Sequence, residues 1–363
     1  MNEKKAKFIY KHNSFDVVED GNHVICAVSG KKIMLNMLIN YYTTNAKKGY
    51  IRINKSGMNI INFAQEFPDE ESCRSDFKSV REKQGVVCKK CQCTKHWWLN
   101  AKWQWKCAKC GFRTTLRSGT FMQNSNLPIR KWYLAMAFMS FSKKGVSATE
   151  LQRQIGHKHY VTVWFLMHRI REAMGERDSQ YTLVDMIEFD EAAVVTATSK
   201  KDKNELKKGR GSQRISNIAV AAESIPLEDI KTGQLSNLCR YFKMQKLESY
   251  KSEEIDNFIE ENVDPASVVT TDKSTSYLNI EGYVEEHITV KSDKVTTQKS
   301  LKWVHIAISN VKRNLLGIYH RIDDKYLQNY LDEFCYKLNR RYFGDKLFDR
   351  LIIAVAGPKG YDS

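Results

Sequence analysis

The chain has 363 residues, with 58 Lys and Arg against 42 Asp and Glu, which is enough length for two or three domains. The hydrophobic fraction of 42% is that of an ordinary globular protein and excludes a collagen-like or wholly disordered chain. No apolar run reaches about eighteen residues, and the polar N-terminus leads into no apolar core. We therefore expect neither a transmembrane helix nor a secretory signal, and a cytosolic protein.

The net charge of +16 is confined to one segment. Residues 83–171 hold 17 of the lysines and arginines and a single acid, Glu150, so the rest of the chain carries equal numbers of basic and acidic residues. This segment is nearly a quarter of the chain and contains almost no acids, which predicts a nucleic-acid-binding module. A merely solvated basic face is the less favoured interpretation.

The first part of the chain predicts two segments. Residues 1–62 alternate short apolar runs with Gly and Lys, and we expect a strand-rich accessory region there, with no function assigned. Residues 63–120 are expected to form a helix over 63–87, with acids in a first turn near Pro68, followed by a ribbon of strands.

Two Cys-x-x-Cys motifs with fifteen residues between them are formed by Cys88, Cys91, Cys107 and Cys110. Each motif aims two thiolates at one point, and two such turns complete a tetrahedron, so the spacing predicts a zinc ribbon. Gly111 suits the tight turn after the second motif. Cys93 and His96 are alternative ligands. The total of nine cysteines, without a signal peptide, argues against a disulfide framework.

Four tryptophans stand between the two motifs, at positions 97, 98, 103 and 105. We expect these rings mostly to form the small core of the ribbon; the alternative is that some of them contact DNA. Three lysines lie among them, Lys95, Lys102 and Lys106. We expect these lysines to face DNA phosphate.

Residues 121–178 predict a helical region. A helix is expected over 128–142, with Pro128 in its first turn; a short helix follows from Ser147 to Gly156, and a longer one covers 160–174. Two helices joined by a Gly turn are typical of a helix-turn-helix, whose second helix enters the major groove. The candidates for contact with DNA are Arg153, Thr162, Trp164, His168 and Arg169.

Residues 179–345 predict an α/β domain in which strands and helices alternate. We expect strands over 183–190, 215–222, 235–242 and 267–272, helices over 252–262, 303–317 and 323–339, and a polar loop over 199–214. Residues 346–363 are expected to form a C-terminal tail.

Two of the expected strands end in an aspartate, Asp190 and Asp272. A carboxylate at the end of a buried strand costs solvation unless it is paired or binds a cation. Two such groups on neighbouring strands attract Mg²⁺ or Mn²⁺, which can catalyse phosphoryl transfer. Each Asp alone is more often a turn residue, but beside a DNA-binding region the pair indicates a catalytic site. Glu188 shares the strand face of Asp190 and can assist it, whereas Glu191 is expected to point away.

Short motifs follow one another in order along residues 63–341: the two cysteine motifs, then 127–132, 142–148, 151–153, 168–171, 188–191, 271–274, 303–305, 309–313, 317–320, 330–334 and 339–341. Together they resemble the zinc-ribbon DDE-type transposases of bacterial insertion sequences, in the group named insertion-sequence family fifteen-ninety-five, which is related to the eukaryotic Merlin elements.

The resemblance implies an RNase H-like fold, a mixed sheet with flanking helices, and a DDE-type metal site. Asp190 and Asp272 match the first two acids of the family. The third member belongs on the late helix, where many relatives carry Glu seven residues before a Lys. Counting back from Lys312 gives His305 here, and Asn310 is the rival, because variants with Asn are known.

His305 can bind a divalent ion through a neutral ring nitrogen, and it shares a helix face with Lys312. Lys312 is expected to contact DNA phosphate near the scissile bond, together with Arg313. The alternative for His305 is a core histidine beside Trp303.

What the resemblance implies as a function is a DNA transposase. The ribbon and the helix-turn-helix would bind the terminal inverted repeats, and the catalytic domain would hydrolyse a phosphodiester and join the freed 3′-hydroxyl to target DNA. The implied cofactors are structural Zn²⁺ and catalytic Mg²⁺ or Mn²⁺, and the implied partners are DNA and further copies of the chain, at the bacterial nucleoid. The alternatives are a catalytically inactive zinc-ribbon regulator and a nuclease without strand transfer.

Overall fold

The computed structural model describes residues 7–11, 14–19, 23–25, 32–34, 58–197, 214–228, 235–291, 300–320 and 322–358. The chain divides into two compact units, one of residues 1–56 and 225–238 and the other of residues 57–224 and 239–363. The smaller unit contains two antiparallel pairs: β1 (Lys7–Lys11) with β2 (Ser14–Glu19), and β3 (His23–Ile25) with β4 (Lys32–Met34). The expected loop over 199–214 lies, except for Arg214, outside the described residues.

The larger unit begins with two helices where one was expected. The side chain of Asn59 caps α2 (Ile60–Glu66), and a capping box between Asp69 and Ser72 starts α3 (Glu70–Gln84). The helices are separated at Pro68 because a proline pushes the residue before it out of the helical region.

The ribbon is a three-stranded antiparallel sheet of β5 (His96–Leu99), β6 (Gln104–Cys107) and β7 (Arg113–Thr115), with a 3₁₀ turn, η1 (Asn100–Lys102), between the first two strands. It packs on α3: the indole of Trp105 donates to Glu82 Oε1 at 3.1 Å, and Lys78 lies over the ring of Trp98. The ribbon therefore shares its core with the helix before it.

Three further helices follow the ribbon: α4 (Ile129–Phe141), α5 (Ala148–Ile155) and α6 (Tyr160–Ser179). The segment expected as a tail contains α11 (Leu347–Ala356), whose Phe348 and Leu351 are buried in the core that α3, α4 and α6 form. The sequence of α11 is almost entirely apolar, so exposing it would cost the free energy of hydrating that surface. The far end of the chain thus completes the first helical core.

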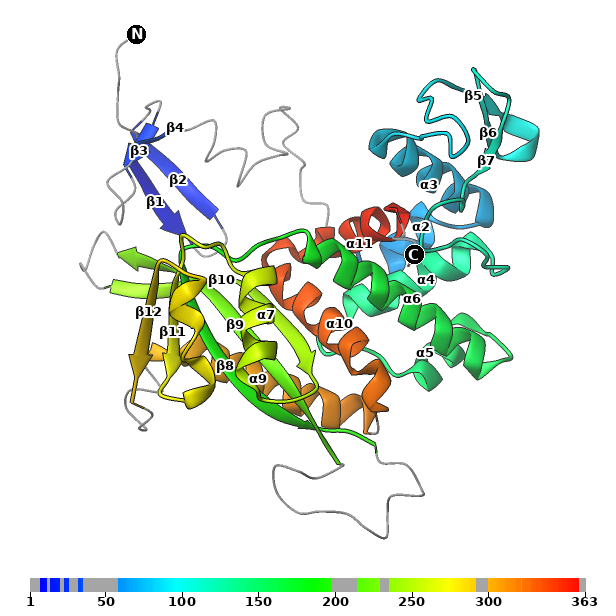
Figure 1. Cartoon of the computed structure of the whole chain (residues 1–363). Coiled ribbons are helices and arrows are strands. Elements are labelled where there is room, and N and C mark those ends of the chain that lie inside the picture. The colour runs from blue at the N-terminus through cyan, green and yellow to red at the C-terminus, as the bar shows by residue number, and fades with distance from the viewer. Residues whose placement is uncertain are drawn as a thin grey trace. The chain divides into compact units, whose positions relative to one another are not determined.

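The chain also forms a five-stranded sheet with the order β10-β9-β8-β11-β12 (Figure 1). Its strands are β8 (Met186–Val195), β9 (Ile215–Glu228), β10 (Leu235–Leu247), β11 (Val268–Asp272) and β12 (Glu286–Val290). The central β8 is antiparallel to β9 and parallel to β11, and β11 is parallel to β12. This mixed order confirms the expected RNase H-like fold. The edge strand β12, whose apolar residues are Ile288 and Val290 alone, was not predicted.

The two faces of β8 meet different helices. Ile187 and Phe189 join the core formed with α7 (Ser252–Asn262), whereas Ala192 and Val194 join the core formed with α9 (Lys302–Asn314) and α10 (Leu327–Asn339). Since side chains alternate along a strand, Asp190 faces the α9 side.

Shorter turns complete the unit: η3 (Thr275–Tyr277), η4 (Ile280–Gly282), the π-helical turn η5 (Leu315–Tyr319), η6 (Asp324–Tyr326) and η7 (Arg341–Lys346). In the described part of the chain, no helix combines the length and the apolar character needed to cross a membrane.

Candidate active site and cysteine cluster

The four predicted cysteine ligands converge at one end of the ribbon. The Sγ atoms of Cys88, Cys91, Cys107 and Cys110 all lie within 4.8 Å of one another. Three of the Sγ–Sγ distances are 3.4, 3.5 and 3.6 Å, close to the edge of about 3.8 Å that a ZnS₄ tetrahedron with 2.3 Å bonds requires. The arrangement fits one tetrahedral metal ion.

The two cysteine motifs share one backbone conformation. The residue after each motif, Gln92 or Gly111, has a left-handed φ of 58° or 72°. In each motif its amide N–H donates to the carbonyl of the first cysteine, at 2.9 and 3.0 Å. The predicted turn at Gly111 is present, and Gln92 adopts the same conformation without the freedom of glycine.

The alternative ligands lie outside the cluster. Cys93 Sγ donates to the carbonyl of Lys95, and His96 Nδ1 lies 3.0 Å from the carbonyl oxygen of Thr94.

Within the cluster, N–H groups of Cys110 and Lys109 point at the Cys107 sulfur and lower the pKa of its thiol to about 6. A thiolate is the form that binds a metal.

The tryptophans of the ribbon divide as expected. Trp98 contacts both Trp103 and Trp105, with ring centroids 5.8 and 5.0 Å apart, whereas Trp97 is exposed. All three predicted phosphate contacts of the ribbon are exposed, Lys95, Lys102 and Lys106. Of the 17 basic residues over 83–171, twelve are exposed, so most of this charge faces solvent.

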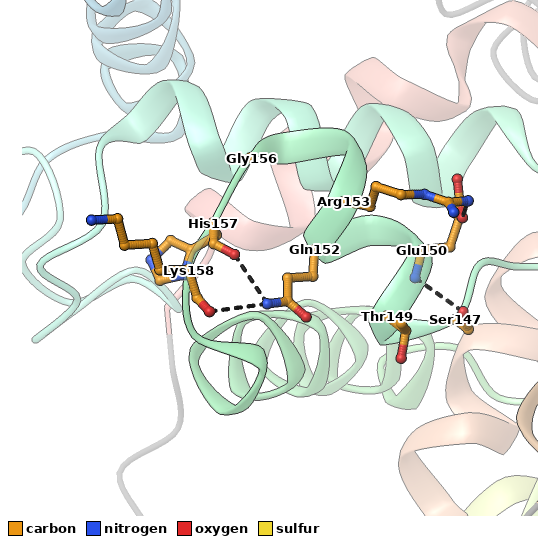
Figure 2. A pocket seen from close by; sticks show the side chains of 8 residues that line it. All are labelled: Ser147, Thr149, Glu150, Gln152, Arg153, Gly156, His157 and Lys158. Carbon is orange, nitrogen blue, oxygen red and sulfur yellow. Dashed lines mark hydrogen bonds and ion pairs between the residues drawn. The ribbon is translucent and has the colours of Figure 1, made fainter.

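The two helices of the expected helix-turn-helix-like region are present as α5 and α6, joined by a turn at Gly156. Ser147 caps α5 by accepting from the Glu150 N–H, and Gly156 ends it in the left-handed conformation. An open groove of about 520 Å³ runs along α5 (Figure 2); its lining consists of Ser147, Thr149, Glu150, Gln152, Arg153, Gly156, His157 and Lys158. Gln152 Nε2 donates to the carbonyls of His157 and Lys158, which holds the turn closed.

Three of the predicted DNA contacts on α6 bind the protein itself. The rings of Trp164 and His168 pack on Tyr326, with centroids 4.7 and 4.9 Å away. Arg169 donates to the carbonyls of Phe121 and Gln123. Its guanidinium thus holds a loop of the protein, a role that the sequence did not predict; the DNA contact of Arg169 stays a prediction. The sequence could not show this, because the partners lie far away along the chain.

The two predicted catalytic aspartates lie on adjacent strands. The parallel register of β8 and β11 pairs Glu188 with Thr270, so continuing it by two residues places Asp272 level with Asp190 on the same face. The Asp190 side chain is 16% exposed. Burial and the neighbouring charge of Asp272 raise the pKa of Asp190 to about 6, as expected for two carboxylates that share a site. Asp272 Oδ1 is buried and has no hydrogen-bond partner.

His305 on α9 faces this acid pair. Its Nδ1 lies 3.8 Å from Asp190 Oδ2, and its side chain is 40% exposed. That distance is too long for a hydrogen bond. Burial lowers the pKa of His305, against the opposing effect of the Asp272 charge. The ring is therefore neutral near pH 7 and has a lone pair available for a metal ion.

The remaining candidates on α9 separate into two faces. The positive charge of Lys312 lowers the pKa of Asp190. Lys312 therefore lies on the same face of α9 as His305. Asn310 Oδ1 instead accepts from Arg313 Nη2 at 3.0 Å. Of the two rivals for the third position, His305 is the one that the structure brings to the acids.

The acidic centre is wider than the cysteine cluster. Among the described residues, the four cysteines are the one set of three or more His, Cys, Asp or Glu whose donor atoms all lie within 4.8 Å of each other. Asp190, Asp272 and His305 are neighbours without converging that closely.

The two glutamates beside Asp190 have other partners. Glu188 accepts from the backbone N–H groups of Trp303 and Val304 at 2.6 and 3.1 Å, a contact with α9 that the sequence did not predict. Glu191 accepts from the hydroxyl of Tyr277. Tyr277 itself was not predicted, and no local pattern in the sequence marks it.

A mixed sheet with Asp190 on its central strand, Asp272 on the next strand and His305 on the helix across them defines an RNase H-like domain with an acidic centre. Residues 182–339 match the ISXO2-like transposase domain family. This match over residues 182–339 confirms the resemblance inferred from the sequence motifs.

Comparisons of the remaining residues and of the whole chain with known proteins give weaker similarities. Residues 17–53 match a family of uncharacterized proteins conserved in bacteria. Solved structures with some similarity include the Mos1 strand transfer complex (12% identity, 60% of this chain and 75% of that chain, TM-score 0.25) and a pre-cleavage Mos1 transpososome (9%, 60% and 76%, TM-score 0.21). No curated protein matches. The fold assignment rests on the strand order and not on these weak similarities.

Proposed function

We propose that the chain is a DNA transposase of the DDE type, in which His305 replaces the usual third acid. It would bind the terminal inverted repeats of its element, hydrolyse a phosphodiester there, and join the 3′-hydroxyl to target DNA. The observation that carries the proposal is the placement of Asp190 and Asp272 on adjacent strands with His305 Nδ1 3.8 Å from Asp190, inside a transposase domain.

The donor set fits a divalent ion. Asp190 and Asp272 offer anionic oxygens, and His305 offers a neutral nitrogen, which suits Mn²⁺ as well as Mg²⁺. Bound there, the metal would supply activation of the attacking oxygen and stabilisation of the leaving oxygen. Lys312, on the same helix face as His305, would hold a DNA phosphate, and Arg313 at the exposed edge would contact the backbone beside it.

The four thiolates fit Zn²⁺, because their number, spacing and Sγ–Sγ distances are those of a structural site. Zinc there would fix the ends of β5, β6 and β7. The ribbon would then present Lys95, Lys102 and Lys106 to the DNA backbone. Arg153, on the exposed groove of α5, is a further candidate for phosphate contact.

The partners follow from the reaction. The protein must hold two element ends and a target, so we propose that two or more copies assemble on DNA. Exposed lysines and arginines on the ribbon and along α5 supply a surface for this binding.

The test is cleavage and joining of a labelled element end in Mn²⁺ or Mg²⁺. We expect Asp190→Ala and Asp272→Ala to abolish both steps, while Glu286→Ala, which removes an exposed carboxylate from β12, leaves them intact. Cleavage that survives Asp190→Ala would refute the proposal. Specific end binding without cleavage in the wild-type protein would indicate the inactive regulator, and cleavage without joined products would indicate a nuclease.

A further inference from the structure

The helix that carries His305 starts without a cap of its own. The N-cap position of α9 is Leu301, whose side chain makes no capping hydrogen bond, and the first turn holds no acid. The N–H groups of the second and third residues of a helix need acceptors from outside the helix. In α9 these residues are Trp303 and Val304, directly before His305.

Glu188, from the central strand, supplies the missing acceptor. Its Oε2 accepts from both N–H groups, at 2.6 and 3.1 Å, across more than a hundred residues of sequence. The side chain is buried, with 5% of the residue exposed. A carboxylate at this position also interacts favourably with the positive end of the helix dipole.

The same device occurs at the start of α4. The carboxylate of Glu70 accepts from the N–H groups of Ile129 and Arg130, at 3.0 and 2.8 Å, and so caps α4 from another helix. Residue Pro128 at the N-cap of α4 offers no side-chain acceptor. In both places a carboxylate from a distant part of the chain accepts hydrogen bonds from the first turn of a helix, and so fixes that end of the helix to a neighbouring element.

Glu188 and Asp190 are two residues apart on β8, so their side chains leave the strand on the same face. One strand therefore provides both the acid next to His305 and the anchor for the two residues before His305. We propose that Glu188 is a positioning residue, which sets the register of α9 on β8 so that the imidazole of His305 faces Asp190. This inference rests on the proposed function, in which His305 is a metal ligand.

The experiment compares Glu188→Gln, which keeps an acceptor oxygen, with Glu188→Ala, which removes it. Glu223→Ala is the matched control, because Glu223 is also a buried glutamate of the sheet but binds Tyr181, Val184 and Arg240 and not α9. The full-length protein is used throughout. Amide hydrogen exchange is measured over the first turn of α9, and Mn²⁺ binding is measured by electron paramagnetic resonance. Pulsed electron paramagnetic resonance detects the coupling of Mn²⁺ to a bound imidazole nitrogen. His305→Ala gives the level of this coupling when the His305 imidazole is absent.

We expect Glu188→Ala to accelerate exchange in the first turn of α9 by about tenfold or more and to weaken Mn²⁺ binding by about tenfold, as loss of a partner that orients a ligand does. The imidazole coupling should fall to the level of His305→Ala. Glu188→Gln should keep all three properties near wild type, and Glu223→Ala should keep the coupling even if it lowers overall stability.

Slow exchange and full imidazole coupling in Glu188→Ala would overturn the inference. A second result would also overturn the inference: Glu188→Gln loses Mn²⁺ binding as severely as Asp190→Ala but keeps slow exchange in α9. Glu188 would then be a metal ligand. In both cases the proposed function stands. A wild-type protein that binds no Mn²⁺ at Asp190 would instead refute the proposed function, and the positioning role with it.

Discussion

The guanidinium of Arg171 on α6 donates from Nε to Glu333 Oε2 on α10 at 2.8 Å, and the two side chains are 1% and 4% exposed. Lys337 and the hydroxyl of Tyr319 also bind the Glu333 carboxylate. Through this network α6 is joined to α10. The ring of Tyr330 lies 4.2 Å from the Arg171 guanidinium carbon and covers it.

Breaking this pair should be costly. Arg171→Ala leaves Glu333 buried with fewer donors, and we expect the free energy of unfolding to fall by about 3–5 kcal/mol. Denaturant unfolding of the variant measures this. Arg153→Ala, which removes the exposed partner of Glu150, is the control and should change stability by less than about 0.5 kcal/mol. An equal loss in both variants would show that the network adds nothing specific.

Next to this network, Asp332 should make stability depend on pH. Burial raises its pKa to about 7, against the opposing hydrogen bond from Gln328, and its Oδ2 lies 2.5 Å from where a Cβ on Gly175 would stand. The folded protein keeps the proton up to about pH 7, whereas the unfolded chain loses it near pH 4, so this group lowers stability as pH rises between those values.

We therefore expect Asp332→Asn to stabilise the protein above pH 7, by up to about 4 kcal/mol, and to have little effect at pH 4. Thermal or denaturant unfolding across this pH range checks the sign. Asp264→Asn is the control: this half-buried side chain accepts a hydrogen bond from the Ala266 N–H, which an amide oxygen can also accept, so the substitution should leave the profile unchanged. A stabilisation that is the same at pH 4 and pH 8 would contradict the assignment.

Metal removal should act on the ribbon first. We expect one Zn²⁺ per chain, and chelation or Cys88→Ser should release it and expose the packed Trp98 and Trp105, because a structural site contributes directly to folding. Metal analysis and tryptophan fluorescence measure this. Cys93→Ser is the matched control, since its sulfur lies outside the cluster, and zinc loss in that variant would contradict the ligand set.

DNA affinity should fall steeply with salt. Replacing Lys95, Lys102 and Lys106 with Ala should weaken end binding and reduce the slope of log affinity against log salt by about 0.9 for each lost phosphate contact. Binding is titrated at several salt concentrations. The charge-matched control replaces three exposed lysines outside the basic segment, Lys251, Lys325 and Lys346. Equal slopes for the two variants would exclude the ribbon as the docking surface.

Several features of the site were predictable because they depend on short-range backbone geometry. A Cys-x-x-Cys turn brings two thiols together whatever surrounds it, so Cys88, Cys91, Cys107 and Cys110 were identified from spacing alone. The strands that contain Asp190 and Asp272 were also visible, since apolar runs bounded by polar residues predict buried strands. The expected strand end at Asp190 was wrong, because β8 continues to Val195. Helices with strong local signals, such as α5 with its Ser147 cap and Gly156 end, were found for the same reason.

By itself, the sequence determined the class of domain, the cysteine cluster, the basic segment and the two acids. Only the tertiary structure decided that His305 and not Asn310 faces those acids, that Glu188 caps α9, that Arg169 serves a loop, and that α11 returns to the first helical core. The physical reason is range: a turn or a helix face depends on residues a few positions apart, whereas these contacts depend on how distant elements pack together, and no local pattern records that packing.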